Sequence, residues 1–181
     1  MARNVQINKS KQKKKIKFEV SVGIFLFRRE KGKILWLLLH YPAGHWDFVK
    51  GHIEKNEKIE ETIRRELAEE TGIRNLKLIP RFQKTLQYWF NNKRYSGRDE
   101  MVFKRVIFLL GETEEKEIRI SEEHLEGRWF TTKEALSIIT FKNVKKYFLQ
   151  AVAFLKKSGI YNYYNYNAKK DFKKNKRIGD N

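Results

Sequence analysis

The sequence predicts an α+β fold, an α/β/α sandwich in which a mixed sheet is flanked by helices. Several segments alternate apolar and polar residues, which is the period of a β-strand, and two others repeat apolar residues at the spacing of a helix. These segments follow one another as strands, helix, strands, helix. That order favours one sheet covered by helices in a single compact unit.

The first predicted strand begins at Lys17 and places alternate apolar residues on one face. These are Phe18, Val20, Val22, Ile24 and Leu26. A turn at 29–32 leads into the continuous apolar run 34–39, which is typical of a buried strand, so the two strands are predicted to form a hairpin. A loop at 41–44 and a short extended segment at 45–50 follow.

An amphipathic helix is predicted next, over Glu57–Thr71, with Gly72 as a left-handed cap at its end. Further strands are expected at 75–90 and 101–110, and a short one at 129–130.

Two helices are expected to close the chain. Thr132 is the predicted N-cap of a short one and Thr140 that of a longer one, which Gly159 ends. The longer helix carries one apolar stripe, formed by Val144, Phe148, Val152 and Leu155.

The 181 residues suit one domain with a tail at each end. We expect a basic, disordered arm at 1–16, a folded domain at 17–160 and an aromatic and basic tail at 161–181. The net charge is +18, of which residues 1–17 carry +7 and residues 165–181 carry +4. This balance predicts attraction to polyanions such as nucleotides or nucleic acid.

The chain has no cysteine, which excludes a disulfide partner and a thiolate metal site. A metal ion would therefore be bound by oxygen or by histidine nitrogen. The absence of cysteine also fits a cytoplasmic protein. The sequence has no segment of transmembrane length, so we expect a soluble protein without a membrane partner.

Three carboxylates lie on one face of the central predicted helix. Glu66, Glu69 and Glu70 are spaced i, i+3 and i+4, and like charges at these spacings destabilise a helix by roughly 0.2–0.5 kcal/mol per pair. They either form a solvated face or bind hard divalent cations, which prefer oxygen ligands.

The residues around these carboxylates resemble the Nudix box. All its defined positions are filled, namely Gly51, Glu57, Arg65, Glu66, Leu67, Glu69, Glu70, Gly72 and Ile73. The resemblance implies a Nudix fold and a hydrolase that cleaves phosphoanhydride bonds of nucleoside diphosphate-linked substrates with Mg²⁺ or Mn²⁺. Within the box, Gly51, Glu57, Leu67, Gly72 and Ile73 are then structural.

The resemblance also implies roles for the charged residues of the box. Glu66, Glu69 and Glu70 would bind the metal ion, with Glu66 as either ligand or general base. Arg65 would orient a neighbouring carboxylate, with Glu57 as its candidate partner in an ion pair.

Backbone groups of the preceding segment are implied as well. The carbonyl of Lys50 would be a further metal ligand, and Gly51 would let the backbone approach the ion.

Residues outside the box bear on the substrate. The run 45–54 is similar to the corresponding segment of asymmetric diadenosine tetraphosphate hydrolases. Lys50 and His45 are expected to contact phosphate, although His45 also fits a strand position. Tyr88 either stacks on adenine or packs at a strand edge. Glu123 either reaches the metal or caps a surface turn.

Three other functions remain open. Hydrolysis of the 5′ end of an RNA, or of nucleoside triphosphates, would use the same box, with the basic tails contacting RNA in the first case. A nucleic-acid-binding module with an inactive Nudix domain belongs to a different class. The intact Glu66, Glu69 and Glu70 argue against that class.

Overall fold

The computed structural model describes residues 15–93, 97 and 100–159. The strands are β1 (Lys15–Glu30), β2 (Lys33–His40), β3 (Trp46–Asp47), β4 (Lys50–His52), β5 (Lys77–Asn91), β6 (Glu100–Glu112) and β7 (Glu126–Thr131). The helices are α1 (Ile59–Thr71), α3 (Thr132–Ile138) and α4 (Lys142–Lys157).

The strands form one mixed sheet in the order β3-β2-β1-β6-β5, with β4 paired to β1 and β7 to β2. Strands β1 and β6 run parallel, in register from Lys15 opposite Glu100 to Phe27 opposite Glu112. The other pairs are antiparallel. The predicted mixed sheet flanked by helices is therefore confirmed.

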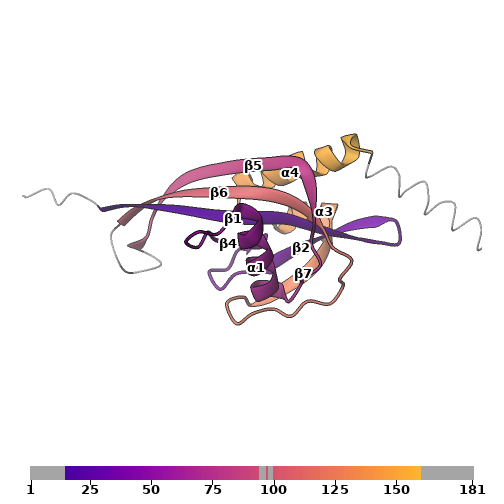
Figure 1. The fold of residues 1–181 in the computed structure, drawn as a ribbon, viewed down its shortest axis with the longest axis horizontal. Coiled ribbons are helices and arrows are strands. Elements are labelled where there is room, and N and C mark those ends of the chain that lie inside the picture. The colour runs from indigo at the N-terminus through magenta and orange to yellow at the C-terminus, as the bar shows by residue number, and fades with distance from the viewer. Residues whose placement is uncertain (1–14, 94–96, 98–99, 160–181) are drawn as a thin grey trace, which may run out of the picture.

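Successive side chains of a strand point to opposite sides of the sheet, and in the middle of the sheet both sides pack into buried cores. On β1, Ile24 faces the core under α1, which contains Ile63 and Leu67. Its neighbour Phe25 faces the second core, which contains Phe148 of α4. Figure 1 shows α1 on the near side of β1 and α4 behind β5.

The hairpin and the end of the central helix form as predicted. Lys31 and Gly32 both have positive φ, 46° and 76°, as a tight two-residue hairpin turn requires. Gly72 is left-handed at φ 75°, and its N–H donates to the carbonyl of Ala68. Helix α1 begins at Ile59 rather than at Glu57.

Both predicted caps of the last two helices were wrong by one residue. Thr131 caps α3, because its side chain accepts from the backbone N–H of Glu134, whereas the hydroxyl of Thr132 accepts a hydrogen bond from Trp36 Nε1 at 2.9 Å. Phe141 is the N-cap residue of α4, and the Thr140 hydroxyl accepts from the backbone N–H of Trp46 at 3.0 Å. Each threonine is used in a contact between distant segments.

The start of β1 differs from the expected arrangement. The strand begins at Lys15, inside the arm expected at 1–16, and Phe18 is 71% exposed because α1 covers only the later part of this face. The rest of the predicted arm and the tail at 161–181 lie outside the described residues. Within the described part of the chain, each helix falls short of the length and hydropathy needed to cross a membrane.

Two adjacent residues of α4 separate the effect of core packing from that of the helix itself. Phe148 is fully buried and its ring lies 4.8 Å from that of Trp36, whereas Leu149 is 48% exposed. We expect Phe148→Ala to lower the free energy of unfolding by ~3–5 kcal/mol, through lost burial and the cavity that remains. Leu149→Ala should change it by about 0.5 kcal/mol or less. Urea unfolding measures both, and equal effects would contradict the described core.

Candidate active site

Helix α1 and strand β4 come into close contact at Gly51. A Cβ added to Gly51 would lie 1.7 Å from Cδ of Glu66, so a side chain here and the present position of that carboxylate exclude each other. Gly51 is held in place by pairing with Val22 of β1. The glycine therefore lets the acidic face of α1 lie directly on the backbone of β4.

Arg65 is the centre of a charged network between α1 and the preceding loop. Its Nε donates to Glu57 at 2.8 Å, its Nη1 donates to Glu66 at 2.8 Å and to Glu69 at 3.0 Å, and its Nη2 donates to the carbonyl of His52 at 3.0 Å. The hydrogen bonds from Arg65 lower the pKa of Glu57 to about 2. The expected ion pair of Arg65 with Glu57 is thus present, and the same guanidinium orients Glu66 and Glu69.

Glu70 is in a different environment from the other two glutamates. It is buried, and its Oε2 has no hydrogen-bond partner within the described ranges, the nearest basic atom being Nε2 of His124 at 3.8 Å. Burial, with the charges of Glu66 and Glu123, raises its pKa to about 8 against the opposing effect of Lys50. The site therefore contains a carboxyl that ionises with difficulty unless a cation is nearby.

Lys50 lies beside Glu70 but turns its amino group inward. Its Nζ forms an ion pair with Asp47 at 3.0 Å and lies 3.9 Å from the centre of the Tyr41 ring. Burial opposes the charge on Lys50, and the negative charge of Asp47 outweighs it and raises the pKa of the amino group. A phosphate contact through Lys50 would therefore require this side chain to move.

Tyr41 is a site residue that the sequence did not single out. Its ring stacks on that of His45 at 4.6 Å and meets the edge of His124 at 4.5 Å. Burial and the charge of Lys50 lower the pKa of both histidines, which favours their neutral forms. The sequence contains one indication that Tyr41 belongs to the site. Tyr41 begins the loop that leads to His45 and Lys50, the residues expected to contact phosphate.

Tyr88 lies on the face of the sheet that carries α4, away from the acidic cluster. It is the cross-strand partner of Lys104 and packs against the core beneath α4. Lys104 Nζ donates to Glu19 at 3.1 Å and lies 3.0 Å from Nε2 of His52, the residue whose carbonyl Arg65 binds. A chain of polar contacts thus runs from Lys104 to α1, while adenine stacking by Tyr88 stays a prediction.

A family model, the NUDIX domain, matches residues 17–152. The chain belongs to the NUDIX family. Among its relatives, asymmetrical bis(5′-nucleosyl)-tetraphosphatase of Mus musculus is 36% identical over 135 residues, covering 68% of this chain and 86% of that protein. An RNA pyrophosphohydrolase of Caulobacter vibrioides is 28% identical over 134 residues, covering 66% and 75%.

The solved structures agree with the family assignment. A binary complex of a Caenorhabditis elegans Ap4A hydrolase superposes with a TM-score of 0.66 at 26% identity, covering 76% of this chain and 98% of that one. The two apolar positions of the Nudix box, Leu67 and Ile73, are fully buried in the core under α1. With Gly72 at the end of α1, they position the charged residues of the box.

The donors of the Nudix box fit a hard divalent cation, although they are not gathered around one point. In the described parts of the chain, no three His, Cys, Asp or Glu side chains meet closely enough to hold a metal ion. Arg65 holds Glu66 and Glu69, while Glu70 points inward with an unpaired oxygen. Such carboxylate oxygens are ligands that Mg²⁺ and Mn²⁺ prefer.

The metal-binding residues therefore stay predictions. They are Glu66, Glu69, Glu70, the carbonyl of Lys50 and Glu123. The side chain of Glu123 is exposed, and its charge raises the pKa of Glu70.

The contact at Gly51 generates a prediction about activity. Gly51→Ala should displace the Glu66 carboxylate, because the new methyl group would occupy its place. We expect hydrolysis of a nucleotide substrate to fall by roughly 100-fold, as for loss of an essential positioned group. Lys55→Ala, a change at an exposed position of the next loop, is the control. Full activity of Gly51→Ala would show that Glu66 can act from another position.

The raised pKa of Glu70 generates a prediction about stability without metal. Between about pH 4.5 and about pH 8 the folded state holds a proton on Glu70 that the unfolded state has released. The free energy of unfolding should therefore fall as pH rises through this window, by at most about 1.4 kcal/mol per pH unit for this proton. Glu70→Gln should flatten the dependence.

The measurement is urea unfolding in the presence of a chelator at several pH values across that window. Glu60→Gln, a change at an exposed position in the first turn of α1, is the matched control and should keep the wild-type dependence. If Glu70→Gln and wild type have the same dependence, Glu70 is ionised in the folded protein.

Proposed function

We propose that this Nudix protein hydrolyses dinucleoside polyphosphates with Mg²⁺ or Mn²⁺ and cleaves diadenosine tetraphosphate into ATP and AMP. The observation that carries the proposal is the acidic face of α1, where Glu70 is buried with an unpaired oxygen beside Glu66. The similarity to asymmetrical tetraphosphatases over most of their length supports the substrate.

The reaction is the attack of water on a phosphoanhydride bond. A divalent cation bound by the glutamates would offset their charge and that of the phosphate oxygens. Glu66 suits a general base, because burial raises its pKa toward the range in which a carboxylate accepts a proton effectively. Arg65 keeps Glu66 and Glu69 in place by donating to both.

The polyphosphate would lie along the side of the site formed by Tyr41, His45 and Lys50. The positive charge of Lys50 acts on Glu70 and lowers its pKa, and a phosphate group entering here would compete with Asp47 for the amino group of Lys50. His45 is half-buried and largely neutral, so it serves as a hydrogen-bond donor or acceptor rather than as a charge. Tyr88 is proposed to stack on a base.

A second candidate function is hydrolysis of the 5′ polyphosphate of an RNA. Two observations favour it, the net charge of +18 and the similarity to RNA pyrophosphohydrolases. In this case the basic segments 1–16 and 161–181 would contact the RNA. Either substrate is consistent with a cytoplasmic enzyme, which is the location we propose.

A substrate panel separates the two functions. The full chain is incubated with Mg²⁺ and, separately, with diadenosine tetraphosphate, ATP, a nucleoside diphosphate sugar or a 5′-triphosphorylated RNA, and the products are resolved by anion exchange. We expect ATP and AMP in equal amounts from the tetraphosphate. Release of pyrophosphate from the RNA alone would transfer the assignment to the second function.

Substitutions in α1 test the proposed roles of the glutamates. Glu69→Gln and Glu70→Gln should each reduce hydrolysis by roughly 100-fold or more, because each removes a carboxylate proposed to bind the metal. Glu60→Gln, exposed on the same helix, should have wild-type activity. Thermal melting with and without Mn²⁺ gives an independent readout, in which Glu70→Gln should lose the metal-dependent rise in Tm. Wild-type rates in both variants would contradict the mechanism.

A further inference from the structure

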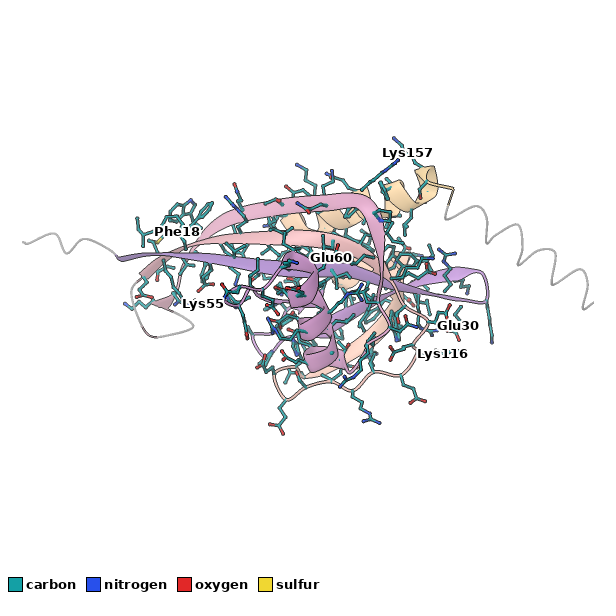
Figure 2. The ribbon with its side chains drawn as sticks, in the orientation of Figure 1. Phe18, Glu30, Lys55, Glu60, Lys116 and Lys157 are labelled. Atoms are coloured by element: carbon teal, nitrogen blue, oxygen red, sulfur yellow. The ribbon has the colours of Figure 1, made fainter. Side chains whose placement is uncertain are left out.

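We propose that this chain binds single-stranded nucleic acid on an aromatic platform at the outer end of its sheet, formed by Phe18, Phe103 and Trp89. The three rings come from β1, β6 and β5. Phe18 is 71% exposed and Trp89 is 53% exposed, although both lie within regular strands. Figure 2 shows Phe18 near the end of the sheet that lies away from Lys157.

The platform is a contiguous surface because the three residues occupy matching positions on neighbouring strands. Phe18 is the register partner of Phe103, which in turn is the register partner of Trp89. The ring centroids of Phe18 and Phe103 are 5.9 Å apart, and those of Trp89 and Phe103 are 5.0 Å apart. Side chains that face one another across strands in this way share one face of the sheet.

The platform continues the face that α1 covers further along the same strands. Val22 and Ile24 on β1 are buried under α1, whereas Phe18 and Val20 on the same face lie beyond the helix. An exposed apolar patch of this kind on a folded domain marks an interaction surface. In the described structure, the platform has no cover from either helix layer.

The charge around the platform indicates a polyanionic partner. The exposed Arg105 lies on the same face, as the register partner of Val20. The acidic residue of this part of β1, Glu19, faces the other way and is paired with Lys17 and Lys104. The sequence before the strand, residues 1–14, carries five Lys or Arg and no acidic residue.

These features suit the bases and phosphates of an unpaired strand better than a second copy of the chain. Bases stack on exposed aromatic rings irrespective of sequence, while neighbouring Lys and Arg neutralise phosphates. Two copies of a chain with a net charge of +18 repel each other, whereas a polyanion is attracted. A duplex, whose bases are already stacked, would use the charges but not the rings.

The platform lies within reach of the candidate active site. Phe18 precedes Val22, the register partner of Gly51, by four residues on the same strand. This separation is ~13 Å at about 3.3 Å per residue. A single-stranded nucleic acid bound on the platform would therefore have one end near the acidic face of α1. The binding proposed here does not depend on which substrate is hydrolysed at that face.

Fluorescence anisotropy with the full chain and a labelled single-stranded oligoadenylate RNA tests the proposal. Phe18→Ala and Trp89→Ala should each weaken binding by about 10-fold, whereas Phe18→Tyr should bind as wild type because the ring is kept. Leu149→Ala, which removes an exposed apolar side chain from α4, should also bind as wild type. The dependence of affinity on salt should be the same in all variants, because phosphate contacts are unchanged.

Two further measurements distinguish base stacking from plain apolar contact and from self-association. Phe18→Leu keeps the apolar area and loses the π face, so it should bind like Phe18→Ala; wild-type affinity for Phe18→Leu would overturn base stacking. Sedimentation without RNA tests for a second copy. A wild-type dimer that Phe18→Ala dissociates, with unchanged RNA affinity, would assign the platform to self-association and overturn the proposal.

The same variants separate this proposal from the proposed enzyme function. Hydrolysis of diadenosine tetraphosphate should be unchanged in Phe18→Ala, because Phe18 lies outside the acidic cluster. It also faces away from Lys104, where the chain of polar contacts to α1 begins. Failure of RNA binding in a chain that hydrolyses the tetraphosphate would overturn the platform alone. Thermal melting verifies that each variant is folded.

Discussion

The guanidinium of Arg65 donates hydrogen bonds to Glu57, to Glu66 and Glu69, and to the carbonyl of His52. These contacts tie the second half of α1, the loop before the helix and the end of β4 into one unit. They also explain how a helix can carry Glu66, Glu69 and Glu70 on one face. Two of these carboxylates share the charge of Arg65, and the third is buried with its pKa raised to about 8.

The position of this unit depends on the sheet beneath it. Gly51 sets the distance between α1 and β4, and β4 is held by pairing with the middle of β1. Because the middle of β1 is buried on both faces, it cannot shift by one residue without exposing one core and placing the wrong side chains in the other. The geometry of the candidate active site thus depends on the buried middle of β1.

The parts of the fold that depend on local sequence were predictable. Alternation identified β1, the apolar run identified β2, and Gly72 marked the end of α1. The caps at Thr132 and Thr140 were wrong because each hydroxyl binds a tryptophan from a distant segment, and local propensity contains no information about that contact.

The part of the site that lies in one continuous segment of the sequence was predictable. The Nudix box identified Gly51, Arg65 and the glutamates, but the inward turn of Lys50 depends on Asp47 and Tyr41 together. The parallel pairing of β1 with β6 was equally inaccessible, because strand patterns do not specify which distant strands pair. The aromatic platform follows from that pairing.

The pairing of β1 with β6 also has a consequence for how the chain folds. Glu19 and Lys104, which lie 85 residues apart in sequence, meet across these two strands. During synthesis β1 therefore leaves the ribosome long before β6 has been made. Until then, the apolar residues of β1 lack their partners on β6. Contacts between such distant segments slow folding, and the pairing of β1 with β6 can form only after the chain has been made through Glu112.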